Sequence, residues 1–208
     1  MKKYNMFCGI DPSFTGMGVS IIDTNNKKII FRELSVELGH GAFAEICRAS
    51  EEMVDKFLTI NKDMIRVDAL VGMEIPPVTG MYAVKLWALD THLYNNLVIN
   101  DKFLFNVPYL KFINKKYEGK KDTRWMIEQI IEVFKDYDYE IEQTLLDKRG
   151  KSRKLTSNEI DSFLYAVRMF VRYSMESATN PDITSEILAI NDKFLEEKET
   201  TLGKKIEE

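Results

Sequence analysis

The sequence predicts an α/β protein in which helices pack against one mixed β-sheet. Three short apolar segments rich in β-formers follow one another near the N-terminus. Two more apolar segments of strand length come later, and segments with helical periodicity lie between and after them. The chain has 208 residues, of which 45% are hydrophobic and 30% charged, so its length and composition suit one sizeable globular core.

The first third of the chain predicts an antiparallel meander followed by a helix. The expected strands are residues 4–10, 17–23 and 28–36. The polar triplet "TNN" at 24–26 is typical of a turn between the second and third of these strands. Apolar residues at helical spacing then predict a helix over 42–60.

The rest of the chain predicts two more strands and four more helices. "ALVGMEI" at 69–75 is a short apolar run that stops at two prolines, and "FLFNV" at 103–107 is another. The expected helices are 81–99, 121–136, 157–175 with Ser157 as its candidate N-cap, and 182–199. Residues 137–155 are acidic, then basic, without clear periodicity, and are expected to be an irregular excursion. We expect one domain over 1–175, and a C-terminal helix with a charged tail over 176–208.

Net charge and local charge point in different directions. The chain carries a net charge of −4 and has a pI of about 5.4, which is not typical of a nucleic-acid-binding protein. Residues 111–124 nevertheless hold six basic and two acidic side chains, and residues 148–154 hold five basic and no acidic ones. Each segment alone is equally consistent with a solvated loop. Because phosphate binding depends on local charge, the overall acidity does not exclude a nucleic-acid partner.

Other features narrow the class of protein. No apolar run approaches the roughly 18–20 residues that span a bilayer, so no membrane association is expected. The N-terminus lacks the long apolar segment of a secretory signal. Cys8 and Cys47 are far apart and have no CxxC partner, so we expect neither a disulfide framework nor a zinc site. A reducing cytoplasm is the expected location.

Two carboxylates stand at or near the ends of expected strands. Asp11 follows the apolar pair Gly9-Ile10, and Glu74 comes at the end of a buried-type strand, just before the prolines. A buried carboxylate without a partner is so unfavourable that such residues are usually exposed, paired or bound to metal. The common alternative for any single Asp or Glu is an ordinary surface position.

The start of the expected helix at 157–175 adds more oxygen ligands. Asn158 and Asp161 are three residues apart and therefore share a helix face, which Glu159 faces less directly. Acids from the first strand, a central strand and a late helix together suggest a metal site, and ligands of this type suit Mg²⁺ or Mn²⁺.

Four blocks of the sequence resemble, in the same order, the RuvC family of Holliday-junction resolvases within the RNase H-like nuclease superfamily. "GIDPSFTGMGVSII" resembles the family's opening motif, and "VGMEIPP" resembles a strand motif that ends in Glu. "INKKYEGKKDTRWMI" resembles a lysine-rich segment that leads into a helix, and "NEIDSFLYAV" resembles the last acidic motif. The blocks span about residues 11 to 167. A lone "GIDP" would equally suit sugar-kinase and actin-like ATPases.

The resemblance implies an RNase H-like fold, whose central five-stranded mixed sheet has three antiparallel strands followed by two parallel ones and is flanked by helices. It also implies a Mg²⁺-dependent endonuclease that cuts branched DNA as a homodimer, with a phage as one conceivable source. Two metal ions per site, with Mn²⁺ as a substitute, activate water and stabilise the leaving oxyanion. Asp11 would bridge the two ions, Glu74 would hold one, and Asp161 the other, helped by Asn158 or Glu159.

Basic residues in the third block are expected to hold DNA phosphates. These candidate residues are Lys115, Lys116, Lys120, Lys121 and Arg124. The bacterial family members carry an aromatic residue a few positions after the strand Glu that stacks on a junction base. Tyr82 is the candidate for that role in this chain, although its spacing differs.

A second departure from the family concerns the helix motif. The family usually has Asp where this chain has Asn158, and an amide brings a ligand oxygen but no charge. Glu159 is the alternative source of that charge. The same departure supports a rival function, an RNase H-fold protein that binds DNA with weak or no catalysis. A sugar-kinase-like ATPase is a further rival, but the chain lacks the second phosphate loop and the adenosine motif of that class.

Overall fold

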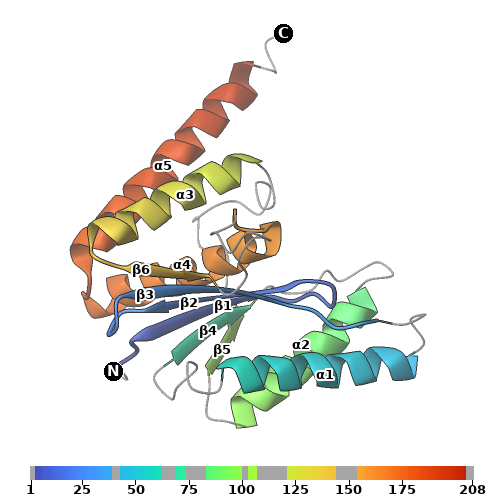
Figure 1. The fold of residues 1–208 in the computed structure, drawn as a ribbon. Helices are drawn as coiled ribbons and strands as arrows, with labels where there is room; N and C mark the ends of the chain where they lie inside the picture. Colours follow the sequence, from blue (N-terminus) through green and yellow to red (C-terminus); the bar gives the residue numbers. More distant parts are fainter. Residues whose placement is uncertain are drawn as a thin grey trace.

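The computed structural model describes residues 3–38, 43–61, 69–73, 83–99, 103–106, 121–143 and 154–204, and these form one sheet with helices on both of its faces (Figure 1). The strands are β1 Met6–Asp11, β2 Met17–Asp23, β3 Lys28–Leu34, β4 Ala69–Met73, β5 Phe103–Asn106 and β6 Glu140–Gln143. The helices are α1 Phe43–Asn61, α2 Ala83–Ile99, α3 Lys121–Asp136, α4 Ser157–Ser177 and α5 Pro181–Lys204.

The expected five-stranded mixed sheet is confirmed, and a sixth strand extends it. The strand order is β5-β4-β1-β2-β3-β6. β1, β2 and β3 form the antiparallel meander, whereas β4 pairs in parallel with β1 and β5 pairs in parallel with β4. β1 therefore lies near the centre of the sheet, where the antiparallel meander meets the parallel strands.

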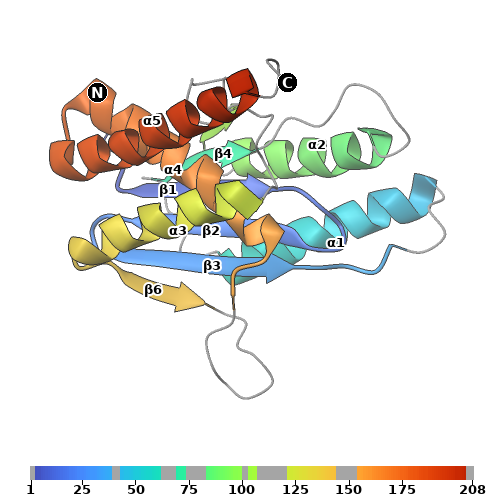
Figure 2. The same cartoon turned by 90° about the horizontal axis from the view of Figure 1, so that it is seen from above.

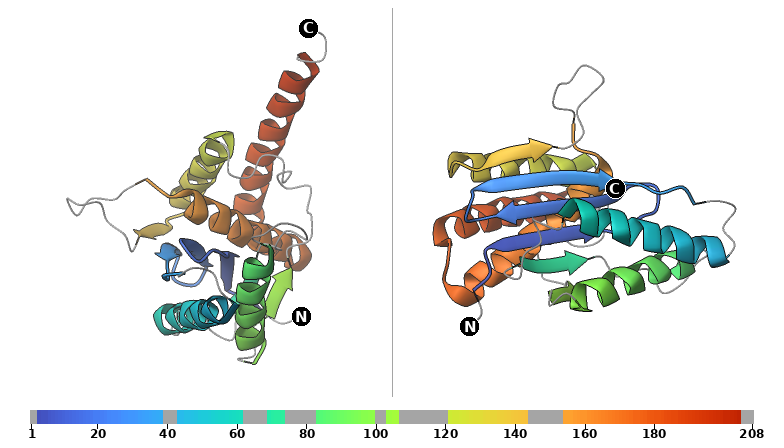
Figure 3. Two further views of the ribbon diagram at one scale, coloured as in Figure 1. Left: turned by 90° about the vertical axis from the view of Figure 1, so that its right-hand side faces the viewer. Right: turned by 60° about the horizontal axis from the view of Figure 1, so that its bottom comes forward.

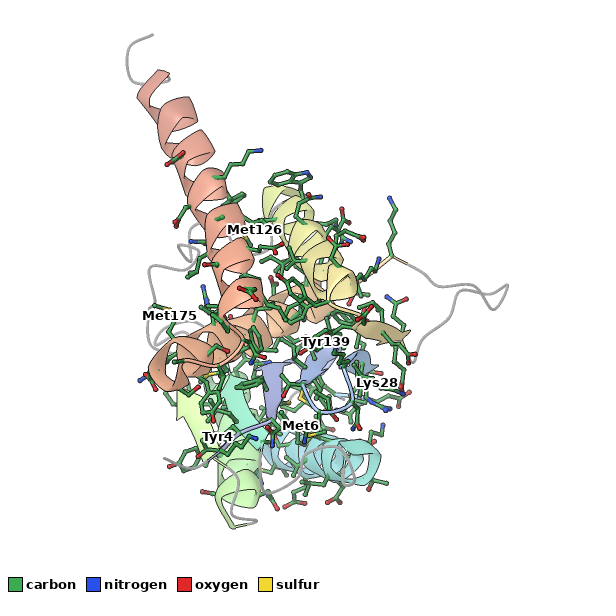
Figure 4. The ribbon with its side chains drawn as sticks, turned by 90° about the vertical axis from the view of Figure 1, so that its left-hand side faces the viewer. Tyr4, Met6, Lys28, Met126, Tyr139 and Met175 are labelled. Carbon is green, nitrogen blue, oxygen red and sulfur yellow. The ribbon has the colours of Figure 1, made fainter. Side chains whose placement is uncertain are left out.

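The sixth strand, β6, corrects the expectation that the whole of 137–155 is irregular. Its four residues, "EIEQ", pair in parallel with β3. Lys28 on β3 lies 4.0 Å from Glu140 and 3.9 Å from Glu142, so charged side chains line this edge (Figure 4). A strand this short and this polar has no hydrophobic alternation to reveal it, and its pairing with β3 is what forms it.

Two helical layers cover the sheet. α1 and α2 lie against one face, and α3, α4 and α5 lie over the other (Figures 2 and 3). Alternate residues of β1 serve the two cores, since Phe7 packs with α4 and Cys8 packs with the residues of α1. Positions 9 and 11 therefore also point to the face that α4 covers.

α4 runs antiparallel along the length of β1. The Tyr4 N–H donates to the hydroxyl of Tyr173 at 3.1 Å, and the rings of Phe7 and Phe170 meet edge to face at 5.4 Å. The first turn of α4 consequently lies at the end of β1 where Asp11 is found.

The N-cap of α4 is Thr156, one residue before the expected Ser157. The Thr156 side chain accepts from the backbone N–H of Glu159, whose carboxylate accepts from the Thr156 N–H at 2.8 Å. This reciprocal capping box satisfies two backbone donors at once, whereas a cap at Ser157 would place a different residue opposite it.

α3 and α5 complete the upper layer. Tyr139, just after α3, packs between that helix and the sheet, edge to face with Phe134 (Figure 4). Burial, and to a smaller extent the charge of Asp23, raises the pKa of the Tyr139 phenol to about 12. α5 places Ile187 and Phe194 in the same core, and its last turns extend beyond the rest of the molecule (Figure 1).

None of the helices described above is both long and apolar enough to cross a membrane.

Candidate functional site

A row of three residues crosses the centre of the sheet at the end of β1. Asp11 is the register partner of Gly18, and Gly18 is the register partner of Glu33. Directly paired residues of antiparallel strands point to the same face, which here is the face covered by α4. Two half-buried carboxylates therefore flank a position that has no side chain.

The first turn of α4 is seated directly on that position. A Cβ on Gly18 would collide with the carbonyl oxygen of Asn158, and a Cβ on Gly9 would collide with that of Ser162. Ser20, the register partner of Gly9 on the same face, donates to the Glu159 carbonyl at 3.2 Å and is hydrogen-bonded to the Ser162 hydroxyl at 2.7 Å. Backbone packing and a buried serine pair thus fix the start of α4 over the row.

The side chain of Asn158 bonds a carboxylate of the row. Its Nδ2 donates to Oε1 of Glu33 at 3.1 Å. Gly16, in the turn between β1 and β2, covers this pair, because a Cβ there would lie 2.5 Å from both bonded atoms. Asn158 is thereby fixed to β3 as well as to β2.

Asp161 and Glu159 differ in what surrounds their carboxylates. Asp161 is half-buried on the same helix face as Asn158, one turn further along α4, and its Oδ1 is shielded from solvent. Glu159 is fully buried, and its carboxylate serves the capping box. This geometry favours Asn158 and Asp161 over Glu159 as the residues of α4 that face a ligand.

Several expected site residues lie outside the described part of the chain. Glu74 follows Met73, the last described residue of β4, whose register partner is Ile10, next to Asp11. The other expected site residues that lie outside the described ranges are Tyr82, Lys115, Lys116 and Lys120.

Two of the expected phosphate-binding residues begin α3. Lys121 is the first residue of the helix, and Arg124 lies one turn further on. One guanidinium N–H of Arg124 donates to the Leu155 carbonyl at 2.7 Å, so this residue ties α3 to the segment just before α4. The half-buried guanidinium therefore has a structural contact in addition to any role with DNA.

The residue types at the end of β1 and in the first turns of α4 suit a hard divalent cation. Asp11, Asp161 and the Asn158 amide would supply oxygen ligands of the kind that Mg²⁺ and Mn²⁺ prefer. Within the described ranges no three His, Cys, Asp or Glu side chains form a ready-made metal-binding cluster. The expected set includes Glu74, which those ranges do not contain.

Glu33 is the site residue that sequence reasoning missed. It lies in "IIFREL", where Ile29 and Phe31 occupy the alternate positions facing α4. A glutamate that continues this apolar alternation is a detectable signal, because period-2 patterning places it on the buried face. In the sequence alone, the polar residues after Phe31 are equally typical of the end of an ordinary strand, so Glu33 was not identified as a candidate.

Solved structures of other proteins are similar to the described fold. "T. thermophilus RuvC in complex with Holliday junction substrate" matches with a TM-score of 0.52 and 10% identity, covering 85% of this chain and 98% of that chain. A second Thermus thermophilus RuvC structure matches with a TM-score of 0.47 and 13% identity, covering 84% and 97%. The human cytomegalovirus terminase nuclease domain, Mn soaked and inhibitor bound, matches with a TM-score of 0.42 and 7% identity, covering 83% and 85%.

The first of these matches establishes the fold. The expected RNase H-like fold, and the resemblance to RuvC at the level of fold, are confirmed. The other two TM-scores are too low to support a conclusion. No family model matches the chain, and no curated protein matches it.

Proposed function

We propose that this protein is a metal-dependent endonuclease that cuts branched DNA, with Holliday junctions as its main substrate. The observation that supports the proposal is the seating of α4 on Gly18, the register partner of Asp11, because it puts the helix turn that contains Asn158 beside the end of β1. The RuvC-like fold supports the same reading, because the matched structure contains a Holliday junction substrate.

In this proposal Asp11, Glu74 and Asp161 hold Mg²⁺ ions, two per site, and Asn158 contributes an oxygen. When bound, the ions generate a nucleophilic water and stabilise the leaving oxyanion. The role of the chain is to hold its oxygen ligands in place. Asp11 ends the central strand, and Asp161 is carried on a helix whose start is fixed by the backbone contacts at Gly9 and Gly18.

The proposal also covers the DNA contacts, the oligomeric state and the cellular location of the protein. Lys115, Lys116, Lys120, Lys121 and Arg124 would neutralise phosphates on one DNA arm, and Tyr82 would stack on a base. A homodimer would present two sites to the two symmetrical strands of a junction. We also propose a reducing cytoplasm as the location, from the low and widely spaced cysteine content, Cys8 and Cys47.

The proposal is tested by cleavage of three DNA substrates, a four-way junction, a flap and a linear duplex, each with Mg²⁺ and with EDTA. We expect Mg²⁺-dependent cutting that favours the junction. D11N should retain DNA binding and lose cleavage by about a hundredfold or more, because a carboxylate that would hold the metal becomes a neutral amide. D55N, an exposed position on α1 on the other face of the sheet, is the matched control and should cut normally.

The outcomes separate the rival functions. Binding of the junction with no cutting under any metal would favour the non-catalytic DNA-binding alternative. Equal cutting of all three substrates would leave a nuclease and remove the junction preference. Normal cutting by D11N would overturn the assignment of the site.

A further inference from the structure

We propose that Glu33 is a positioning residue of this metal site: it orients the amide of Asn158 and supplies the negative charge that Asn158 lacks. The inference rests on the proposed function. It concerns the contact between β3 and α4, in which Nδ2 of Asn158 donates to Oε1 of Glu33 at 3.1 Å.

The hydrogen bond fixes which way the amide faces. An ionised carboxylate only accepts hydrogen bonds, so Glu33 must meet the NH₂ side of Asn158. The amide oxygen, Oδ1, is then turned away from Glu33. Outer carboxylates orient metal-binding side chains in this manner, and losing one typically weakens metal binding.

The same contact accounts for the missing charge. With aspartate at position 158, a carboxylate in direct contact with Glu33 would create repulsion between two half-buried anions. With asparagine there, the pair keeps one negative charge and gains a hydrogen bond. Glu33 and Asn158 together therefore resemble, in charge, a single carboxylate whose negative end lies on β3.

The surroundings hold this pair in one arrangement. Glu33 is in register with Gly18, on which the Asn158 backbone rests. Gly16 lies against the two bonded atoms, and a Cβ there would be 2.5 Å from each of them, so a side chain at position 16 would displace the pair. The pair is therefore held by β3, by α4 and by the β1–β2 turn. The ion pairs at the β6 edge are exposed and have no such support.

The test exchanges the two partners. We would measure Mn²⁺ binding to the EDTA-treated full chain without DNA, by electron paramagnetic resonance, for wild type, E33Q, N158D and the double variant E33Q/N158D. E33Q keeps an acceptor for Asn158 but removes the charge, and we expect about tenfold weaker Mn²⁺ binding. In the double variant the introduced amide donates to the introduced carboxylate, so charge and hydrogen bond are both restored and binding should return close to wild type.

A metal-free measurement and a control accompany it. In EDTA, N158D should melt at a lower temperature than wild type, because it places two carboxylates in contact, and E33Q should reverse that loss. E140Q removes the same charge from β6, where Glu140 is the register partner of Lys28 at the other end of β3, and should bind Mn²⁺ as wild type does.

Each outcome decides the inference. If wild type binds Mn²⁺ and E33Q binds it equally well, or if the double variant is no better than E33Q, Glu33 has no such role and the proposed function still stands. If wild type neither binds Mn²⁺ nor cuts DNA, the proposed function fails and this inference fails with it.

Discussion

Glu159 and Asp161 are two acids on the same turn of α4 that the structure uses for different purposes. The carboxylate of Glu159 is buried and caps the helix, and that of Asp161 lies on the face that Asn158 shares. A sequence pattern shows both acids near the helix start but not which way each points. The difference arises because the cap is Thr156, which puts Glu159 at the position that completes a capping box.

This assignment makes opposite predictions for the two residues. E159A removes the acceptor for the Thr156 N–H and should lower the free energy of unfolding by about 1–2 kcal/mol, with Mn²⁺ affinity retained. D161N should do the reverse, losing Mn²⁺ affinity with little change in stability. Urea denaturation in EDTA and Mn²⁺ titration measure the two quantities. A loss of Mn²⁺ binding in E159A equal to that in D161N would show that Glu159 is a ligand.

Candidate site residues could be predicted from the sequence where residue type and position in a strand or helix identify them. They could not be predicted where a contact between distant parts of the chain identifies them. Asp11 follows a hydrophobic strand, and Asp161 begins an amphipathic helix, so both are visible locally. The bond between Glu33 and Asn158 joins residues 125 positions apart. Only the register of β3 with β2, and the seating of α4 on β2, bring them together.

At the scale of elements, the contact between α4 and the β1–β2 pair determines where the site lies. Gly9 and Gly18 let helix backbone touch strand backbone, and no side chain separates them. Gly9 lies against the backbone carbonyl of Ser162, and Gly18 lies against that of Asn158. Any side chain at either glycine must move the helix or the strand.

We therefore expect G9A and G18A each to destabilise the fold by roughly 2–4 kcal/mol, more than typical overpacking because the clash is with backbone. G18A should also weaken Mn²⁺ binding in the fraction that remains folded, since it displaces the turn that carries Asn158. T15A, an exposed position in the same β1–β2 turn, is the control and should leave stability unchanged. Thermal melting with and without Mn²⁺ measures both effects, and a wild-type melting temperature in G9A would contradict the packing described here.

The elements themselves were largely predictable. Strands 17–23 and helix 121–136 coincide with the expected ranges, because their apolar periodicity is strong and their ends carry clear turn or cap residues. β6 was missed because four mostly polar residues become a strand only when β3 offers them an edge. The parallel pairings at β4 and β5 came from the family resemblance, since periodicity cannot reveal strand direction.

At the scale of the whole molecule, α5 belongs to the core that covers the site face of the sheet. Ile183, Ile187 and Phe194 are buried in the cluster that also holds residues of α3 and α4. The division at residue 175 remains a prediction about organisation, but this packing indicates that the first 175 residues depend on the helix that follows.

Truncation tests this dependence. A chain that stops after Thr179 loses all three buried side chains, and we expect it to be unfolded or aggregated, because each deletion of this kind costs about 2–5 kcal/mol. A chain that stops after Glu197 retains them and should melt near the full-length temperature. Circular dichroism and size-exclusion chromatography distinguish the two. A folded, monodisperse 1–179 chain with normal melting would show that α5 is dispensable.

The backbone contact at Gly18 has a consequence for how a ligand would be received. Because the start of α4 packs directly on the backbone of β2 and is hydrogen-bonded to Ser20, we expect the strand end and the helix turn to behave as one rigid unit before anything binds. Preorganisation of this kind removes the entropic cost of ordering the protein on association. Ligand binding beside the contact between α4 and β2 should therefore leave the amide hydrogen exchange of these two elements almost unaltered. Their protection from exchange should already be high in the free protein.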